Sequence, residues 1–154
     1  MIEKRLRIAD FEIEFINRSD QPIHFEEGYI DFLSDSDTSS SDVHVNVFAS
    51  IPDELKQLDE IIYSAEFNGN TLWKISRISN GLRFYVYDAN SPFELQQVAD
   101  LTSNFSEWKV YTEPITWESK TGVFPLMYPM GPLMMYYLTA KYDAVMIHGS
   151  GISH

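Results

Sequence analysis

Apolar and polar residues alternate along several segments, which is the pattern of a strand with one buried face. Residues 6–16 place three apolar side chains on one side and two glutamates on the other, so we expect one half-buried strand there. Residues 43–48 alternate in the same way and predict another strand. Residues 25–33 predict a further extended segment, with a bulge at Gly28.

A meander of three antiparallel strands is the clearest local pattern. Residues 60–67, 71–78 and 82–87 each have strand character. Asn68-Gly69 separates the first two, and residues 79–81 (Ser-Asn-Gly) separate the last two. Asn and Gly tolerate positive φ, which tight hairpin turns require. We therefore expect two short turns here.

The remaining segments before residue 120 have weaker patterns. Residues 51–58 predict one or two helical turns, since Pro52 suits a first helical position. Residues 88–100 predict irregular or partly helical structure, and 108–112 predict a strand. The Ser- and Asp-rich stretch 34–42 predicts a solvated loop.

The last part of the chain changes character. Residues 132–141 place apolar side chains on one helical face and predict a helix. Residues 144–147 (Ala-Val-Met-Ile) predict a short strand buried on both faces. Together these elements predict a single β-rich domain over residues 1–154. Its fold class is α+β, with a mainly antiparallel sheet, a C-terminal helix and a final buried strand.

The composition limits which cellular compartment and which classes of partner are expected for the protein. The 154 residues contain no cysteine, and the charged N-terminus is followed by no apolar run, which fits the cytoplasm. Prolines and charges interrupt the most apolar segment, 124–147, so we expect no membrane helix. The net charge of −12 would repel nucleic acid and favours either simple solubility or a basic protein or peptide partner.

Motifs for metal binding or nucleophilic catalysis are incomplete. A calcium loop of the EF-hand type starting at Asp35 would need Gly and Glu where Ser40 and Asn46 stand. Ser150 lies in His-Gly-Ser-Gly, which lacks the first Gly of a hydrolase elbow. We therefore expect a solvated acidic loop and no catalytic residue in this chain.

Four aromatic side chains on the predicted strands are candidates for a ligand-binding face. Core packing is the alternative role for such residues, because aromatic side chains bury large areas in sheets. The candidates are Trp73, Phe84, Tyr85 and Trp108, and Tyr87 at the end of the third meander strand could join them.

The C-terminal stretch resembles bacterial proteins related to HPr kinase and phosphoenolpyruvate carboxykinase. The resemblance lies in the order of an apolar helix, a short buried strand (144–147) and His148-Gly149-Ser150-Gly151. It covers residues 125–154. In those proteins a hairpin and then a P-loop follow. The β-rich part before it resembles their variable N-terminal region.

The resemblance implies a role for one residue. His148 matches the histidine that ligates manganese in the carboxykinases, so it would bind metal only in a longer parent protein. Such a parent would use ATP with Mg²⁺ or Mn²⁺. The P-loop pattern Gly-x-x-x-x-Gly-Lys-Ser/Thr does not occur in the chain. For this chain alone we therefore expect no cofactor and no phosphate transfer.

Three functions remain open at this point. The first is a non-catalytic accessory or substrate-positioning domain of such a kinase-like protein. It would dock a nucleotide-binding domain, or self-associate, through the apolar segment 133–152. The second is a free-standing small-molecule or peptide binding module with an aromatic-lined sheet. The third is an acid–base enzyme that uses strand carboxylates, with candidates Glu12, Glu14, Glu26 and Glu27.

Overall fold

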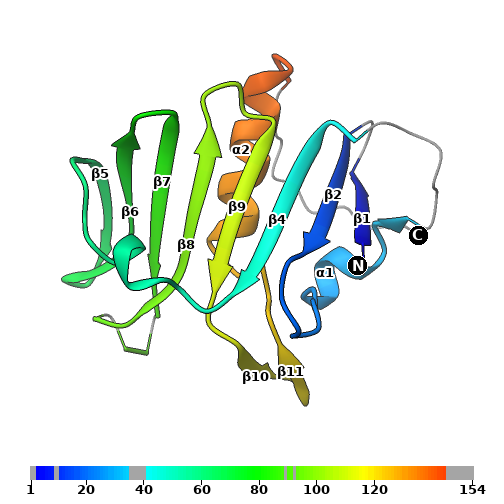
Figure 1. Ribbon diagram of the computed structural model, residues 1–154, viewed down its shortest axis with the longest axis horizontal. Coiled ribbons are helices and arrows are strands. Elements are labelled where there is room, and N and C mark those ends of the chain that lie inside the picture. The colour runs from blue at the N-terminus through cyan, green and yellow to red at the C-terminus, as the bar shows by residue number, and fades with distance from the viewer. Residues whose placement is uncertain (1–2, 9–10, 35–40, 89, 92, 145–154) are drawn as a thin grey trace, which may run out of the picture.

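The fold is built on one large sheet with a single long helix on one face (Figure 1). The computed structural model describes residues 3–8, 11–34, 41–88, 90–91 and 93–144. In these residues nine strands form the sheet, in the order β3-β1-β2-β4-β9-β8-β7-β6-β5. Most neighbouring strands are antiparallel, but β4 pairs in parallel with both β2 and β9. The α+β class with a mainly antiparallel sheet is confirmed.

The elements follow one another in a simple order. The strands of the large sheet are β1 (Glu3–Ile8), β2 (Phe11–Asn17), β3 (Leu33–Ser34), β4 (Val43–Ala49), β5 (Ile61–Phe67), β6 (Asn70–Ile78), β7 (Gly81–Tyr87), β8 (Leu95–Thr102) and β9 (Glu107–Thr112). A separate hairpin is formed by β10 (Ile115–Trp117) and β11 (Lys120–Gly122). The helices are α1 (Glu27–Ile30), the 3₁₀ turn η1 (Asp53–Leu55) and α2 (Met130–Lys141).

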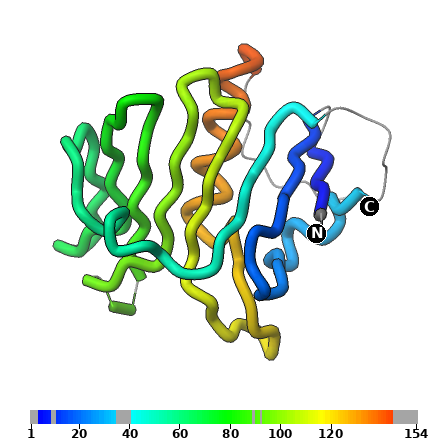
Figure 2. The backbone as a smooth tube through the Cα atoms, in the orientation of Figure 1, coloured from blue at the N-terminus to red at the C-terminus, as the bar shows by residue number. Residues whose placement is uncertain are grey.

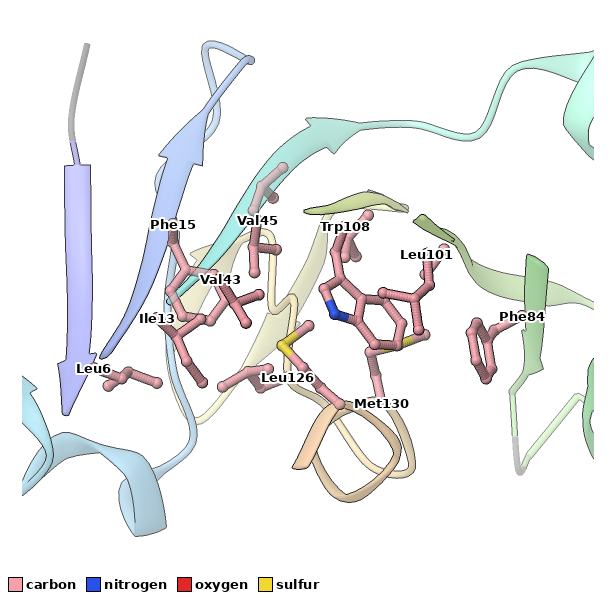
Figure 3. Close-up of a cluster of buried hydrophobic side chains, with 14 of the residues drawn as sticks. Leu6, Ile13, Phe15, Val43, Val45, Phe84, Leu101, Trp108, Leu126 and Met130 are labelled. Atoms are coloured by element: carbon pink, nitrogen blue, oxygen red, sulfur yellow. The ribbon is translucent and has the colours of Figure 1, made fainter. Parts of the chain in front are cut away.

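The main core lies between the sheet and α2, which is behind the sheet in Figure 1. Leu126 and Met130 enter this core from the start of the helix and the segment before it. Figure 3 shows them facing sheet residues that include Val43 and Trp108. The alternating pattern of β4 explains this arrangement, because every second side chain points to the same face.

A smaller core lies on the opposite face of the sheet. The connection from β4 to β5 crosses that face, as Figure 2 traces, and places Ile51 against Tyr85 and Val98. The hydroxyl of Tyr85 donates a 3.0 Å hydrogen bond to the Gln57 carbonyl oxygen. Both faces of the central strands are therefore partly covered, one by a helix and one by an irregular segment.

The predicted meander is confirmed over β5, β6 and β7. The turn between β5 and β6 contains Asn68 and Gly69, both at positive φ (51° and 79°). Gly81 begins β7 at φ 146°, and a Cβ at this position would overlap the Leu101 carbonyl oxygen. The predicted strand at 43–48, the strand at 108–112 and the helix at 132–141 are confirmed, and the 3₁₀ turn lies within the predicted segment 51–58.

Several predictions about local structure are wrong. The single strand predicted over 6–16 is a hairpin of β1 and β2, so its alternating pattern continues through two strands. The extended segment predicted at 25–33 contains the short helix α1. The segment 88–100, predicted to be irregular or partly helical, contains most of β8. Residues 95–102 form a strand because of their position in the sheet, where pairing with β7 and β9 supplies backbone hydrogen bonds on both sides.

The hairpin of β10 and β11 was not predicted. It is short and mostly exposed. Its turn places Glu118 and Ser119 at positive φ without a glycine, so the usual turn signal is missing. The strand predicted at 144–147 lies outside the described residues except for Ala144, and most of the loop predicted at 34–42 lies outside them too.

Candidate functional site

A pocket of about 420 Å³ is the most extended of three cavities described here. It lies where the ends of three sheet strands, the β10–β11 hairpin and the segment leading into α2 meet. It is lined by Leu72, Tyr87, Asp88, Asn90, Gln96, Ile115, Thr116, Trp117, Met127, Tyr128 and Pro129. Small-molecule sites in proteins usually have about 300–1,000 Å³ and mostly apolar walls.

Three aromatic rings contribute to the wall of this pocket, which we call the aromatic pocket. Tyr87 ends β7, Trp117 ends β10, and Tyr128 lies just before α2. Trp117 is 46% exposed and Tyr128 is 64% exposed. These exposures are high for large aromatic side chains, so the rings are available to a ligand.

The polar groups of the aromatic pocket are held by local contacts. Asp88 accepts a 2.8 Å hydrogen bond from the backbone N–H of Asn90 through its Oδ1 atom. Gln96 Nε2 lies 3.1 Å from the sulfur atom of Met127 and donates to it. Asp88 is the one charged residue among the residues that line the pocket.

Two smaller cavities have a different character. One of about 200 Å³ lies beside Asp100, Glu107 and Lys109. The other, of about 280 Å³, adjoins the aromatic pocket and includes Lys74. Lys74 Nζ lies 5.7 Å from the centre of the Tyr87 ring, which is a cation–π distance.

The four predicted ligand-face residues do not share one surface. Phe84 and Trp108 belong to the main core, where their ring centres are 5.2 Å apart. Tyr85 belongs to the smaller core on the opposite face. All three are 1% exposed or less, so they correspond to the core-packing alternative.

Trp73 lies at the edge of the main core. Its side chain packs against the core cluster but is only partly buried. Its indole nitrogen is buried and has no hydrogen-bond partner in the structure. An unpartnered buried N–H is costly, but Trp73 does not line any of the three cavities described above.

Of the predicted carboxylates, Glu14 is held by ion pairs. Arg5 Nη2 donates to Glu14 Oε1 at 2.9 Å, and His44 Nδ1 lies 2.9 Å from Glu14 Oε2. Burial alone would raise the pKa of Glu14, but the hydrogen bonds and charges of Arg5 and His44 outweigh it. The pKa therefore lies below its ordinary value of 4.5. A carboxylate held ionised by two partners is suited to a structural role.

The other carboxylates show no catalytic arrangement. Burial, and then the charge of Glu118, raise the pKa of Glu26 above its ordinary value. Glu12 lies beside Arg5, with its Oε1 atom 3.7 Å from Arg5 Nη1, and Glu27 is exposed in α1. Among the described residues, no three His, Asp or Glu side chains are grouped so that they could hold a metal ion.

A second charge cluster stabilises the face opposite α2. Arg83 Nε donates to Asp100 Oδ1 at 2.6 Å, and its Nη2 atom donates to Oδ2 at 2.9 Å. Arg83 also donates to Asp59 at 3.1 Å, in the connection that crosses this face. The paired carboxylate raises the pKa of Arg83 further. The cluster joins that connection to the sheet.

His148 and Ser150 lie outside the described residues, so the metal-binding role that the resemblance implies for His148 stays a prediction. No helix in the described ranges is long and apolar enough to cross a membrane. The chain matches no family model, and comparisons with curated proteins and with solved structures gave no match either.

Of the three rings of the aromatic pocket, the sequence indicated Tyr87 as a possible ligand contact, but it did not indicate Trp117 or Tyr128. Trp117 and Tyr128 stand in segments without a strand pattern of alternation. The one sequence signal available was their position beside turn residues, since Glu118-Ser119 follows Trp117 and Pro129 follows Tyr128. Tyr87, Trp117 and Tyr128 come to line one cavity only through tertiary packing.

Proposed function

We propose that this chain is a non-catalytic accessory or substrate-positioning domain of a cytoplasmic protein related to HPr kinase and phosphoenolpyruvate carboxykinase. In this proposal the outer face of α2 docks the nucleotide-binding domain of that protein. The composition of α2 is the observation that carries the proposal. The resemblance of residues 125–154 supplies the family.

Helix α2 is apolar on nearly all sides. Its twelve residues include a single charged side chain, Lys141, in the last turn. One side of the helix faces the core through Met130, Met134 and Leu138. The opposite side includes Tyr136, which is 59% exposed. A helix with few charged residues is often covered by another part of the protein on its exposed side as well.

The charge of the chain supports a partner of opposite sign. The net charge of −12 would attract a basic domain or a basic substrate protein over a range set by the salt concentration. An accessory domain of this kind needs no catalytic residue of its own. The nucleotide chemistry would be supplied by the partner domain.

The gene and a longer protein test this proposal together. We expect the reading frame after residue 154 to encode a P-loop within about 20 residues, the span of a short hairpin connection. In the longer protein, we expect the amides of α2 to exchange hydrogen more slowly than in the chain 1–154. Tyr136→Asp should reverse that protection, because it places a charge in the contact.

Tyr63→Asp is the matched control, since Tyr63 is a 53% exposed tyrosine on β5, away from α2. It should leave the exchange of α2 unchanged. A reading frame without a P-loop would contradict the family. Equal exchange of α2 in the short and long proteins would contradict the docking surface.

A second candidate function, ligand binding by a free-standing module, is favoured by the aromatic pocket. Its volume of about 420 Å³ and its aromatic walls fit a small molecule or one side chain of a peptide. The residues that would contact the ligand, apart from Tyr87, differ from those that the sequence predicted. The exposed rings are Trp117 and Tyr128 in place of the buried Phe84 and Trp108.

A further inference from the structure

The aromatic pocket combines three aromatic rings with one negative charge. Tyr87, Trp117 and Tyr128 come from three separate segments and line the same cavity. The faces of aromatic rings carry partial negative charge and attract cations, most strongly in the case of Trp. No Lys, Arg or His is among the described residues that line the cavity.

Asp88 adds a full charge to this environment. Its Oδ1 atom is held by the backbone N–H of Asn90 at 2.8 Å, which orients the carboxylate. The net charge of −12 adds a field that concentrates cations around the molecule. An anionic ligand would meet repulsion from both sources.

The Tyr87 ring already has a cation near it. Lys74 Nζ lies 5.7 Å from the ring centre, from the side of the adjoining cavity. This contact shows that the Tyr87 ring can pair with a positive group. The positive charge of Lys74 would also repel a second cation bound near the Tyr87 ring. Replacing Lys74 by a neutral residue therefore tests whether the ligand is positively charged.

From these observations we infer that the aromatic pocket binds an organic cation, specifically a methylated ammonium group. Such a group has a spread charge and an apolar surface, so it gains from ring faces and loses little hydration. The group could belong to a free small molecule or to a methylated lysine in a peptide. This inference deepens the second candidate function, and it is independent of docking through α2.

Titration with two ligands of the same shape tests the charge requirement. Choline is the cationic probe, and 3,3-dimethylbutan-1-ol is its neutral analogue. Binding is measured by calorimetry and by the NMR signal of the Trp117 side chain. We expect choline to bind at least tenfold more tightly than the neutral alcohol. A short peptide with trimethyllysine, compared with the same peptide carrying leucine, distinguishes a peptide source from a free ligand.

Four variants test the assigned residues. Trp117→Leu and Asp88→Asn should each weaken choline binding by roughly five- to thirtyfold, whereas Trp117→Phe should keep most of it. Lys74→Met should tighten choline binding and leave binding of the alcohol unchanged. Because the Trp117 side chain is exposed, we expect its replacement to leave the protein folded. The melting temperature of each variant shows whether weaker choline binding comes from the pocket or from loss of folding.

Two results would overturn the inference. Equal affinity for choline and the neutral alcohol would leave a ligand pocket without cation selectivity. Absence of binding by all probes would also remove the second candidate function. In both cases docking through α2 would be unaffected, because its test measures hydrogen exchange on a different surface.

Discussion

At the scale of single residues, Glu14 illustrates how burial and pairing compete. Desolvation opposes its charge, but Arg5 and His44 hold it ionised, so its pKa is below 4.5 in the folded protein. The folded state therefore binds fewer protons here than the unfolded state does. It follows that this contribution to stability is complete above pH 4.5. It is lost as the pH falls from 4.5 through the lower, folded-state pKa.

We expect Glu14→Gln to lower the free energy of unfolding by about 0.5–1 kcal/mol at pH 7, the usual range for charge pairs near a surface. The difference from the wild-type protein should shrink towards zero as the pH falls below 4.5. Thermal melts across this pH range measure the effect. Glu66→Gln, at an exposed position of β5, is the control and should show no such trend. A difference that persists at low pH would show that the charge of Glu14 is not the cause.

At the scale of elements, the strands are joined by turns with very different tolerance for side chains. Gly81 sits at φ 146°, and a Cβ there would overlap the backbone oxygen of Leu101 in β8. Gly69 also has positive φ, but a Cβ there would meet no atom within 4 Å. Substituting each glycine by alanine therefore distinguishes two contributions to the loss of stability. At Gly69 only the strained backbone conformation contributes, whereas at Gly81 steric overlap with Leu101 is added.

We expect Gly81→Ala to destabilise the protein by about 2–5 kcal/mol, because strain in φ and overlap with a backbone atom add. Gly69→Ala should cost only about 1–2 kcal/mol, from conformation alone. Urea unfolding of both variants measures the difference. Equal losses would mean that β7 and β8 can separate slightly at no cost, against the paired register of Gly81 with Thr102.

At the scale of the whole molecule, the negative net charge and the lack of a P-loop motif in the sequence both predict that the chain does not bind ATP. The chain has no Gly-x-x-x-x-Gly-Lys sequence, and its net charge of −12 repels polyphosphates. We expect ATP with Mg²⁺ or Mn²⁺ to leave the melting temperature of the chain 1–154 unchanged. Binding at 100 times the dissociation constant would add about 2.7 kcal/mol of stability. A rise that depends on ATP concentration would therefore contradict the accessory-domain proposal.

Much of the local structure followed from patterns in the sequence. The alternation in β4 and the Asn-Gly turn between β5 and β6 predicted these elements correctly, because side-chain period and turn conformation are local properties. The apolar residues of 132–141 predicted α2 for the same reason. Patterns of this kind report which face is buried, but they do not report where a strand ends or which strand pairs with it.

The tertiary structure alone decided the remaining features. The hairpin at 3–17, the strand β8 and the parallel pairing of β4 depend on neighbours that are distant in sequence. The aromatic pocket depends on them most. Tyr87 at the end of β7 and Trp117 at the end of β10 line the same cavity although they are far apart in the sequence. The sequence shows that these aromatic residues are present. Whether they line the same cavity is decided by contacts between segments that are distant in the sequence, and a local pattern of residues does not report such contacts.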